Sequence, residues 1–450
     1  MTRPPATTLV DTLDRARLPA RAAFVGILLL ATLSSYDFSP DPGEVATRLA
    51  RALDPQVGAR DAIDALRNLA LFAGWGVVWM ATASAGRTTR QLFWALATGA
   101  VISVGVETAQ IFSATRNASV LDVATNTLGT AIGAVGFVVL VRLAAGLRGR
   151  RSFVGIPALV IAGSYGLACF LEAAVPLFRQ DEVSGAVGGP IGRLGVVLAT
   201  FTWRSLLDLP LEDFLLFLPA GMFAVAALVE AGASYPVARN RTLIYGTALA
   251  LVAELLHGPN GQPIIAGAVL IHALAIGLGA VIAARFVPGW SQAFRGAARP
   301  RSVLRLLAVL IALWALRPWV PEFLPLSERL SADWWVPLAA LGGRMEVFSV
   351  VDVVGPFCLY FPLGALLAVW PWRRHGWMAD LWPAVWLAFG TEALQLVVQG
   401  RFVDVTDPLI QLSGALIGWT IIRRAGYRPY GECARTASRP GASPARPAGS

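Results

Sequence analysis

Long apolar runs separated by short polar segments dominate the pattern along this chain. A helix needs about 20 residues to cross a hydrocarbon core of about 30 Å, and most of the runs approach that length. Within hydrocarbon every backbone polar group must be paired inside the protein, so we expect helices. The runs predict about twelve membrane-spanning helices, at residues 20–36, 68–85, 92–112, 119–142, 153–175, 211–230, 242–257, 263–285, 303–320, 352–371, 380–398 and 405–422.

The composition excludes the soluble globular classes. Of the 450 residues, 56% are hydrophobic and only 14% are charged, and the mean hydropathy is +0.61. Soluble domains carry roughly 25% charged residues. The three cysteines, Cys169, Cys358 and Cys433, lie far apart and form neither a disulfide framework nor a zinc pattern. Because the chain has only three histidines as well, we expect no metal and no cofactor.

The charge of the chain indicates its orientation in the membrane. The formal net charge is +9, and all 37 basic residues are arginines. A basic soluble protein would suggest a nucleic-acid partner, which the hydropathy excludes here. With the N-terminus in the cytoplasm, every short inner loop is basic, as the positive-inside rule requires of an even number of spans. We therefore expect both termini in the cytoplasm, and a disordered tail at residues 425–450, which have almost nothing to bury.

Two distant stretches of the chain match each other without a gap. One begins near the end of the third predicted span and the other near the end of the eleventh, and seven polar or glycine positions coincide. The matched pairs are Glu107 and Glu392, Gln110 and Gln395, Arg116 and Arg401, Asp122 and Asp407, Asn126 and Gln411, Gly129 and Gly414, and Gly133 and Gly418. So many coincidences at one register indicate an internal repeat.

The middle third of the chain carries a partial copy. Glu254 and His257 repeat the acid and the residue three positions further on. A one-residue deletion then aligns two more pairs, which are His272 with Asn126 and Gly279 with Gly133. The arginine and the following aspartate are missing from this copy. A short pattern in the second span recurs three times, at Phe72–Gly76, Phe217–Gly221 and Tyr360–Gly364.

These observations predict an all-α, polytopic membrane helix bundle made of three tandem four-helix repeats. Repeat 1 covers residues 1–150, repeat 2 covers residues 151–298 and repeat 3 covers residues 299–424, before the tail at residues 425–450. Because each repeat has an even number of spans, all three have the same orientation and are parallel, unlike the inverted repeats of many transporters. The longer outer loops are expected to pack over the outer face, at residues 37–67, 176–210 and 321–351.

The pattern E-x2-Q, then R, then D-x3-N-x2-G-x3-G within a four-helix repeat resembles the VanZ-like domain. The resemblance is strong in repeat 1, good in repeat 3, where Gln411 replaces the asparagine, and weak in repeat 2. The family is named after a bacterial membrane protein linked to resistance to the antibiotic teicoplanin, a glycopeptide. The resemblance implies a multi-pass protein of the bacterial inner (cytoplasmic) membrane with a role in the cell envelope, and it implies no particular reaction.

The polar positions of the fourth span share one face of a helix. At about 100° per residue, Asp122, Asn126, Gly129 and Gly133 return to one stripe, and the matched residues of repeat 3 do the same. The acid and the glutamine of the preceding span also share a face, and the short loop lets both faces meet near the outer leaflet. The glycines would let another helix approach closely, and the loop arginine would pair with a carboxylate.

Two interpretations of these clusters stay open. In the first, each cluster locks the hairpin of the third and fourth spans. In the second, it binds a polar head group, such as a lipid phosphate or a carrier-linked sugar, because ionisable residues inside a membrane commonly mark function. The candidate residues are Glu107, Gln110, Arg116, Asp122 and Asn126 in repeat 1, and Glu392, Gln395, Arg401, Asp404 and Asp407 in repeat 3.

We therefore expect a non-enzymatic envelope protein whose partners are membrane lipids and a cell-wall precursor or envelope glycan. A transporter or flippase of a lipid-linked or small polar substrate is the alternative, and an intramembrane enzyme acting on a lipid head group is a third. The sequence has no P-loop, nucleophile elbow or zinc-protease motif. His257 and His272 are expected to face each other across one hairpin, and Glu172 is expected near the outer interface, without a role.

Overall fold

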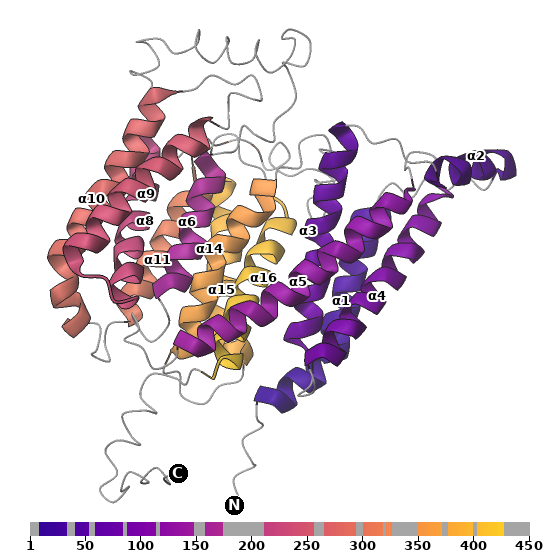
Figure 1. Cartoon of the computed structure of the whole chain (residues 1–450), viewed down its shortest axis with the longest axis horizontal. Coiled ribbons are helices and arrows are strands. Elements are labelled where there is room, and N and C mark those ends of the chain that lie inside the picture. The colour runs from indigo at the N-terminus through magenta and orange to yellow at the C-terminus, as the bar shows by residue number, and fades with distance from the viewer. Residues whose placement is uncertain are drawn as a thin grey trace, which may run out of the picture. The chain divides into compact units, whose positions relative to one another are not determined.

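The computed structural model describes residues 9–33, 41–53, 59–83, 88–113, 118–147, 158–173, 211–255, 265–293, 300–317, 321, 323, 325, 350–370, 377–398 and 403–426. Within these ranges the chain is helical, with isolated β-bridges such as the one between Pro321 and Val398. The helices (Figure 1) are α1 (Leu9–Leu33), α2 (Pro42–Leu53), α3 (Ala59–Ala81), α4 (Thr88–Gln110), α5 (Val120–Leu147), α6 (Ala158–Ala173), α8 (Leu211–Glu230), α9 (Tyr235–Leu255), α10 (Ala266–Ala293), α11 (Pro300–Ala315), α14 (Val350–Val369), α15 (Trp377–Gln395) and α16 (Thr406–Arg424).

The helices agree with the hydropathy pattern. Each predicted span overlaps one of them, and the remaining helix, α2, lies in the first predicted outer loop. In the described part of the chain, four segments are long and apolar enough to cross a membrane, namely Thr88–Gln110, Val120–Gly146, Asp213–Glu230 and Ala266–Ala283. Shorter apolar helical segments lie at Leu71–Ala81, Ala158–Ala173, Val303–Ala315 and Val354–Val369. The fold is therefore that of a helical membrane protein with several spans.

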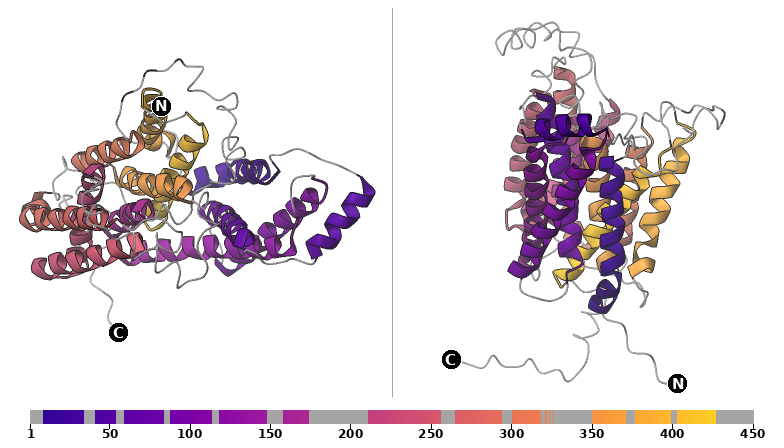
Figure 2. Two further views of the ribbon diagram at one scale, coloured as in Figure 1. Left: turned by 90° about the horizontal axis from the view of Figure 1, so that it is seen from above. Right: turned by 90° about the vertical axis from the view of Figure 1, so that its right-hand side faces the viewer.

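The chain forms two compact bodies. The N-terminal body comprises residues 1–143 and 333–345, and the C-terminal body comprises residues 144–332 and 346–450. In the C-terminal body α8 packs extensively against α10, and α14 packs extensively against α16, while α6 contacts both α8 and α14. Figures 1 and 2 show these helices side by side. The predicted repeats 2 and 3 thus share one body, which α6 and α14 join.

Large apolar side chains cover the outside of several helices, and on α4 small residues lie on the inside. On α4, Val101 is 71% exposed and Phe93 is 62% exposed, whereas Ala95, Gly99 and Ser103 are buried. In water this distribution would be unfavourable. In a bilayer it is favourable, because lipid tails are as apolar as the exposed side chains and small residues let helices pack closely.

Glycines bring the second and fourth helices of each predicted repeat into backbone contact. A Cβ atom on the glycine that ends the second-span pattern would collide with a carbonyl oxygen of the fourth helix; the pairs are Gly76 with Thr130, Gly221 with Ile276 and Gly364 with Ala415. Glycines of the fourth helix lie equally close to carbonyl oxygens of the second helix, and these pairs are Gly133 with Ala73, Gly279 with Leu218 and Gly418 with Phe361. The close approach expected from the glycines is therefore present, and its partner is the second helix.

Candidate functional site

Glu107 is buried near the end of α4, in the N-terminal body, and fixes the start of α5. Its Oε2 accepts a hydrogen bond from the backbone N–H of Ser119 at 3.0 Å. The Ser119 hydroxyl oxygen accepts in turn from the Leu121 N–H at 3.1 Å, which is the usual way in which serine caps a helix N-terminus. A carboxylate at this end also interacts favourably with the helix dipole. Glu107 thus joins the third and fourth helices of repeat 1.

Two hydrogen bonds between side chains follow along α5. Asn68 of α3 donates from Nδ2 to Asp122 Oδ1 at 3.0 Å. Asn126 donates from Nδ2 to the Ser103 hydroxyl of α4 at 2.8 Å. Asp122 is partly buried and lies within electrostatic range of Glu107. The structure therefore brings together the predicted stripe of α5 and the acid of α4, and it adds two partners, Asn68 and Ser103, that lie outside the repeated motif.

Gln110 connects this cluster to the first helix and lies beside a contact with α2. Gln110 is buried, and its Nε2 donates to the Thr32 carbonyl of α1 at 3.0 Å. One residue further on, the Ile111 carbonyl accepts from Arg48 of α2 at 3.4 Å. The helix in the 37–67 loop therefore contacts the polar end of α4, and its position over the outer face stays a prediction.

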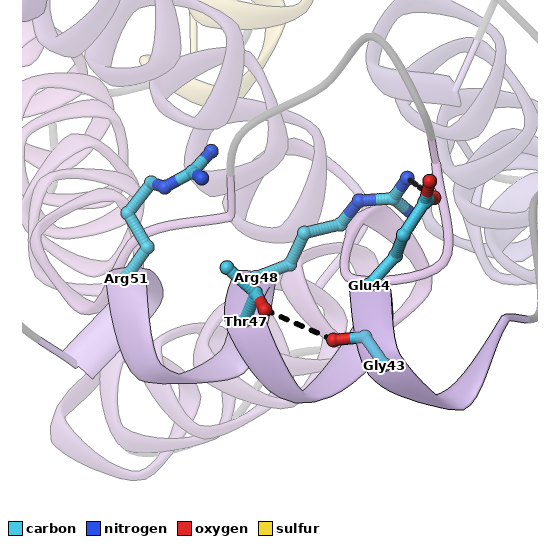
Figure 3. A pocket seen from close by; sticks show the side chains of 5 residues that line it. All are labelled: Gly43, Glu44, Thr47, Arg48 and Arg51. Atoms are coloured by element: carbon cyan, nitrogen blue, oxygen red, sulfur yellow. Dashed lines mark hydrogen bonds and ion pairs between the residues drawn. The ribbon is translucent and has the colours of Figure 1, made fainter.

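A surface hollow of about 320 Å³ lies along one side of α2. Its lining residues are Gly43, Glu44, Thr47, Arg48 and Arg51. Figure 3 shows Arg48 directed at Glu44 and the Thr47 hydroxyl directed at the Gly43 carbonyl. Because all five residues come from one short helix and Arg48 is already paired, the hollow is an open feature of the surface and not an enclosed site.

Glu392 makes the corresponding bond in repeat 3. Its Oε1 accepts from the Asp404 N–H at 2.7 Å. Asp404 Oδ1 accepts from both the N–H and the hydroxyl of Thr406, at 2.9 and 2.8 Å, where α16 begins. Asp404, a predicted site residue, thus binds the first residue of α16, and it lies 12 residues after the glutamate, as Ser119 does in repeat 1. Gln395 is also buried, and it is the last residue of α15, the helix that carries Glu392.

Several predicted residues lie outside the described part of the chain. These include both loop arginines, Arg116 and Arg401, and the histidine His257. The expected pairing of the arginines with carboxylates and the expected pair of histidines therefore stay predictions. Asp407 is described and lies partly buried in the first turn of α16. Among the described residues, no group of three or more His, Cys, Asp or Glu side chains is placed to hold a metal ion.

Glu254 makes the same bond in the middle of the chain. It is buried near the end of α9, and its Oε1 accepts from the Ile265 N–H at 2.6 Å, just before α10. Acid and donor are 11 residues apart here and 12 residues apart in the other two repeats. This difference matches the one-residue deletion in the alignment. The glutamate therefore locks the hairpin in all three places.

Several buried polar atoms in the described part of the chain have no hydrogen-bond partner, and three of them share one position of the repeat. At one aligned position of α5, α10 and α16, a buried polar atom has no hydrogen-bond partner among the residues described; the three are Asn126 Oδ1, His272 Nδ1 and Gln411 Oε1. Their side chains are only 1%, 3% and 4% exposed. An unpaired buried polar group costs about 1–3 kcal/mol, and such groups are rare in native proteins.

His272 also belongs to a charged cluster in the C-terminal body. Its Nε2 lies 3.0 Å from Asp213 Oδ2 of α8. Arg317, just past α11, donates to Asp213 Oδ1 at 2.9 Å and also binds Glu172 of α6. The pairing of His272 with His257 stays a prediction, whereas Glu172, for which the sequence indicated no role, binds Arg317. The observed partners are 59, 104 and 145 residues apart along the chain, so no local spacing could reveal them.

Comparison with known families agrees with the repeated motif. A family model described as VanZ/LLP1 matches residues 19–142 and, separately, residues 302–426. Together these matches cover more than half of the chain and correspond to predicted repeats 1 and 3. No curated protein and no solved structure matches this chain. The resemblance drawn from the motif is thereby confirmed.

Proposed function

Because this chain belongs to the VanZ/LLP1 family, we propose that it is a protein of the bacterial inner membrane that binds the polar head group of an envelope lipid or glycan. The binding group is the polar end of a four-helix repeat, where the third and fourth helices meet. The protein acts in the cell envelope by binding and not by catalysis.

The proposed arrangement in the membrane is twelve spans in three parallel repeats, with both termini in the cytoplasm. Three observations support it. Each predicted span overlaps a helix, the short inner loops are basic, and the glycine contact between second and fourth helices recurs three times. In this orientation Glu107, Glu254 and Glu392 lie toward the outer ends of their helices, so a ligand reaches the polar ends from the outer face.

The observation that carries the proposal is the unpartnered polar atom at one aligned position. Asn126 Oδ1 and Gln411 Oε1 are hydrogen-bond acceptors. The missing partner must therefore donate a hydrogen bond, which a sugar hydroxyl does and a fully ionised phosphate does not. The loop arginines, Arg116 and Arg401, are suited to a phosphate. A sugar joined to a lipid phosphate offers both groups, so a carrier-linked glycan is the favoured ligand class.

Binding of a polyprenyl-phosphate-linked disaccharide to the purified protein in nanodiscs tests the proposal. Asn126→Leu and Gln411→Met remove the two acceptors and nearly preserve side-chain volume. We expect each substitution to weaken binding at its own site about tenfold, since that factor corresponds to about 1.4 kcal/mol, close to one hydrogen bond. Thr420→Val is the matched control, because the buried Thr420 hydroxyl bonds within its own helix and its loss should leave binding unchanged.

Two outcomes would count against the proposal. Unchanged affinity in the double variant N126L/Q411M, together with unchanged or raised thermal stability, would assign both amides to helix packing alone. Equal affinity for the same polyprenyl phosphate without its sugar would show that the hydroxyl groups contribute nothing, and the glycan class would be wrong.

A further inference from the structure

Asp213 is the centre of a charged cluster that draws on four helical segments of the C-terminal body. Its Oδ2 lies 3.0 Å from Nε2 of His272 on α10. Its Oδ1 accepts from Arg317 Nη1 at 2.9 Å, and Nη2 of the same guanidinium binds Glu172 of α6. The side chains of Arg317, Asp213 and Glu172 are 14%, 17% and 21% exposed. The histidine is therefore deeply buried, while the charged groups next to it keep some access to the surroundings.

The cluster occupies repeat positions that carry amides elsewhere in the chain. Asp213 lies eight residues before the shared glycine of its repeat, as Asn68 does in repeat 1, and His272 aligns with Asn126. The middle repeat thus has an ionisable pair where repeat 1 has two asparagines. It lacks the loop arginine of the motif, and Arg317, from repeat 3, brings a guanidinium to it instead. The middle repeat is therefore more than a partial copy of its neighbours.

The neutral imidazole of His272 can bind one more proton, at Nδ1. Because Nε2 faces the Asp213 carboxylate, the neutral ring carries its hydrogen at Nε2 and a lone pair at Nδ1. Nδ1 is buried and has no hydrogen-bond partner in the described part of the chain. Phe217 stacks on the ring, with centroids 4.0 Å apart and 12° between the planes, which fixes the orientation of the imidazole.

The charges of the cluster balance when that proton is bound. Asp213 and Glu172 contribute two negative charges, and Arg317 contributes one positive charge. Counted over these described groups, the cluster carries one net negative charge around a neutral imidazole and none around an imidazolium. A buried site favours the neutral sum, because an uncompensated charge is costly away from water.

Three further titratable groups on the packed helices α6 and α9 are hydrogen-bonded to other atoms. On α6, the Tyr165 hydroxyl and the Cys169 thiol donate to the Leu216 carbonyl at 2.8 and 3.7 Å, and neither carries a charge while it is protonated. On α9, Glu254 is held by the Ile265 N–H. The hydrogen-bonded counter-charge of the imidazole is therefore the Asp213 carboxylate.

We propose that His272 is a proton-binding site within this charged cluster. A proton from water binds the Nδ1 lone pair, and Asp213 holds the resulting imidazolium while Glu172 and Arg317 complete the charge balance. Buried ionisable chains of this kind mark proton relays in membrane proteins. Because His272 and Arg317 share Asp213, the proton acts directly on the contact between repeats 2 and 3. The site stands independently of head-group binding.

A variant with His272 as its only histidine reports on this proton directly. The substitutions H257Q and H375Q remove the other two histidines, and glutamine is the residue that repeats 1 and 3 have at the position aligned with His257. ¹⁵N NMR of the labelled imidazole in nanodiscs distinguishes the neutral ring from the imidazolium. We expect the neutral form with hydrogen at Nε2 at about pH 8, and conversion to imidazolium by about pH 5, the range in which histidine changes charge.

The D213N variant tests whether the cluster holds the proton. Asparagine occupies the aligned position in repeat 1, at Asn68, so the substitution suits the fold. Loss of the carboxylate removes the counter-charge of the imidazolium, and we expect less imidazolium in D213N than in the sole-histidine parent at about pH 5. A ring that stays neutral at about pH 5 in the parent, or an imidazolium signal that D213N leaves unchanged, would overturn the proposal. The first outcome is decided in the sole-histidine protein alone, even if D213N fails to fold.

Discussion

A glutamate near the end of each third helix accepts a hydrogen bond from a backbone N–H close to the start of the fourth helix. The three glutamates, Glu107, Glu254 and Glu392, are all buried. Each accepts a hydrogen bond from a backbone N–H one or two residues before the next helix begins. The first N–H groups of a helix have no partner within the helix, so an acceptor from the preceding helix stabilises the hairpin whether or not a ligand is present.

Substitution of Glu392 separates this lock from any effect of its charge. E392L removes the acceptor and leaves the Asp404 N–H without its hydrogen-bond partner. This loss should lower the free energy of unfolding by about 1–3 kcal/mol. E392Q keeps an acceptor oxygen and should lose clearly less. Thermal unfolding of both variants in the same detergent compares them. An E392Q protein as unstable as E392L would show that the charge matters and the hydrogen bond does not.

At the scale of single residues, the sequence predicts the site residues that recur in more than one repeat and misses the site residues that do not. The repeated glutamates and the amide of each stripe follow from the alignment. Asn68 and Asp213 escape it because repeat 3 has Pro356 at the aligned position, so no common polar type remains. Arg317 escapes it because its two partners are distant in sequence, and only packing brings them together.

At the scale of helices, the contact between the second and fourth helices sets the spacing of each repeat. On α16 the Gly418 position faces the Phe361 carbonyl of α14, and Gly364 of α14 faces the Ala415 carbonyl. A side chain at either place would push two backbones apart. Since lipid offers little drive to hold helices together, close packing is the main stabilising term in a membrane.

Alanine at Gly418 should therefore destabilise the C-terminal body. We expect G418A to lower the free energy of unfolding by about 1–3 kcal/mol, the usual range for overpacking, measured by thermal unfolding in detergent. G390A is the matched control, because a Cβ at Gly390 of α15 meets nothing within 4 Å. Alanine should even stabilise that helix slightly, by up to about 1 kcal/mol. Equal losses in both variants would contradict the packing role of Gly418.

Helix positions follow from the sequence more closely than helix partners do. A bilayer imposes length and apolarity on each span, so the runs locate the helices, including α4, α5, α8 and α10. The helix that packs against the glycine stripe does not follow from the sequence in the same way. Sequence proximity favours the third helix of the hairpin, whereas the structure places the second helix there, because a Cβ atom at Gly129 or Gly133 of α5 would collide with the backbone of α3.

At the scale of the whole molecule, the orientation in the membrane decides which side the polar ends can serve. The chain offers its own reporter. Cys169 and Cys358 are buried, and Cys433 lies in the predicted cytoplasmic tail, outside the described residues. Exposed thiols react and buried ones are inert, so a membrane-impermeant maleimide should modify Cys433 only after the membrane has been opened.

The loop arginine of repeat 1 provides the opposite test. In a C433S background, R116C should be labelled in intact spheroplasts, because an even number of spans with basic inner loops puts this loop outside. C433S alone should stay unlabelled there. If the native Cys433 reacts in intact spheroplasts and R116C does not, the polar ends around Glu107 and Glu392 face the cytoplasm. A carrier-linked glycan exposed on the outer leaflet could then not reach Asn126 or Gln411, so the sidedness experiment limits the ligand as strongly as a binding measurement does.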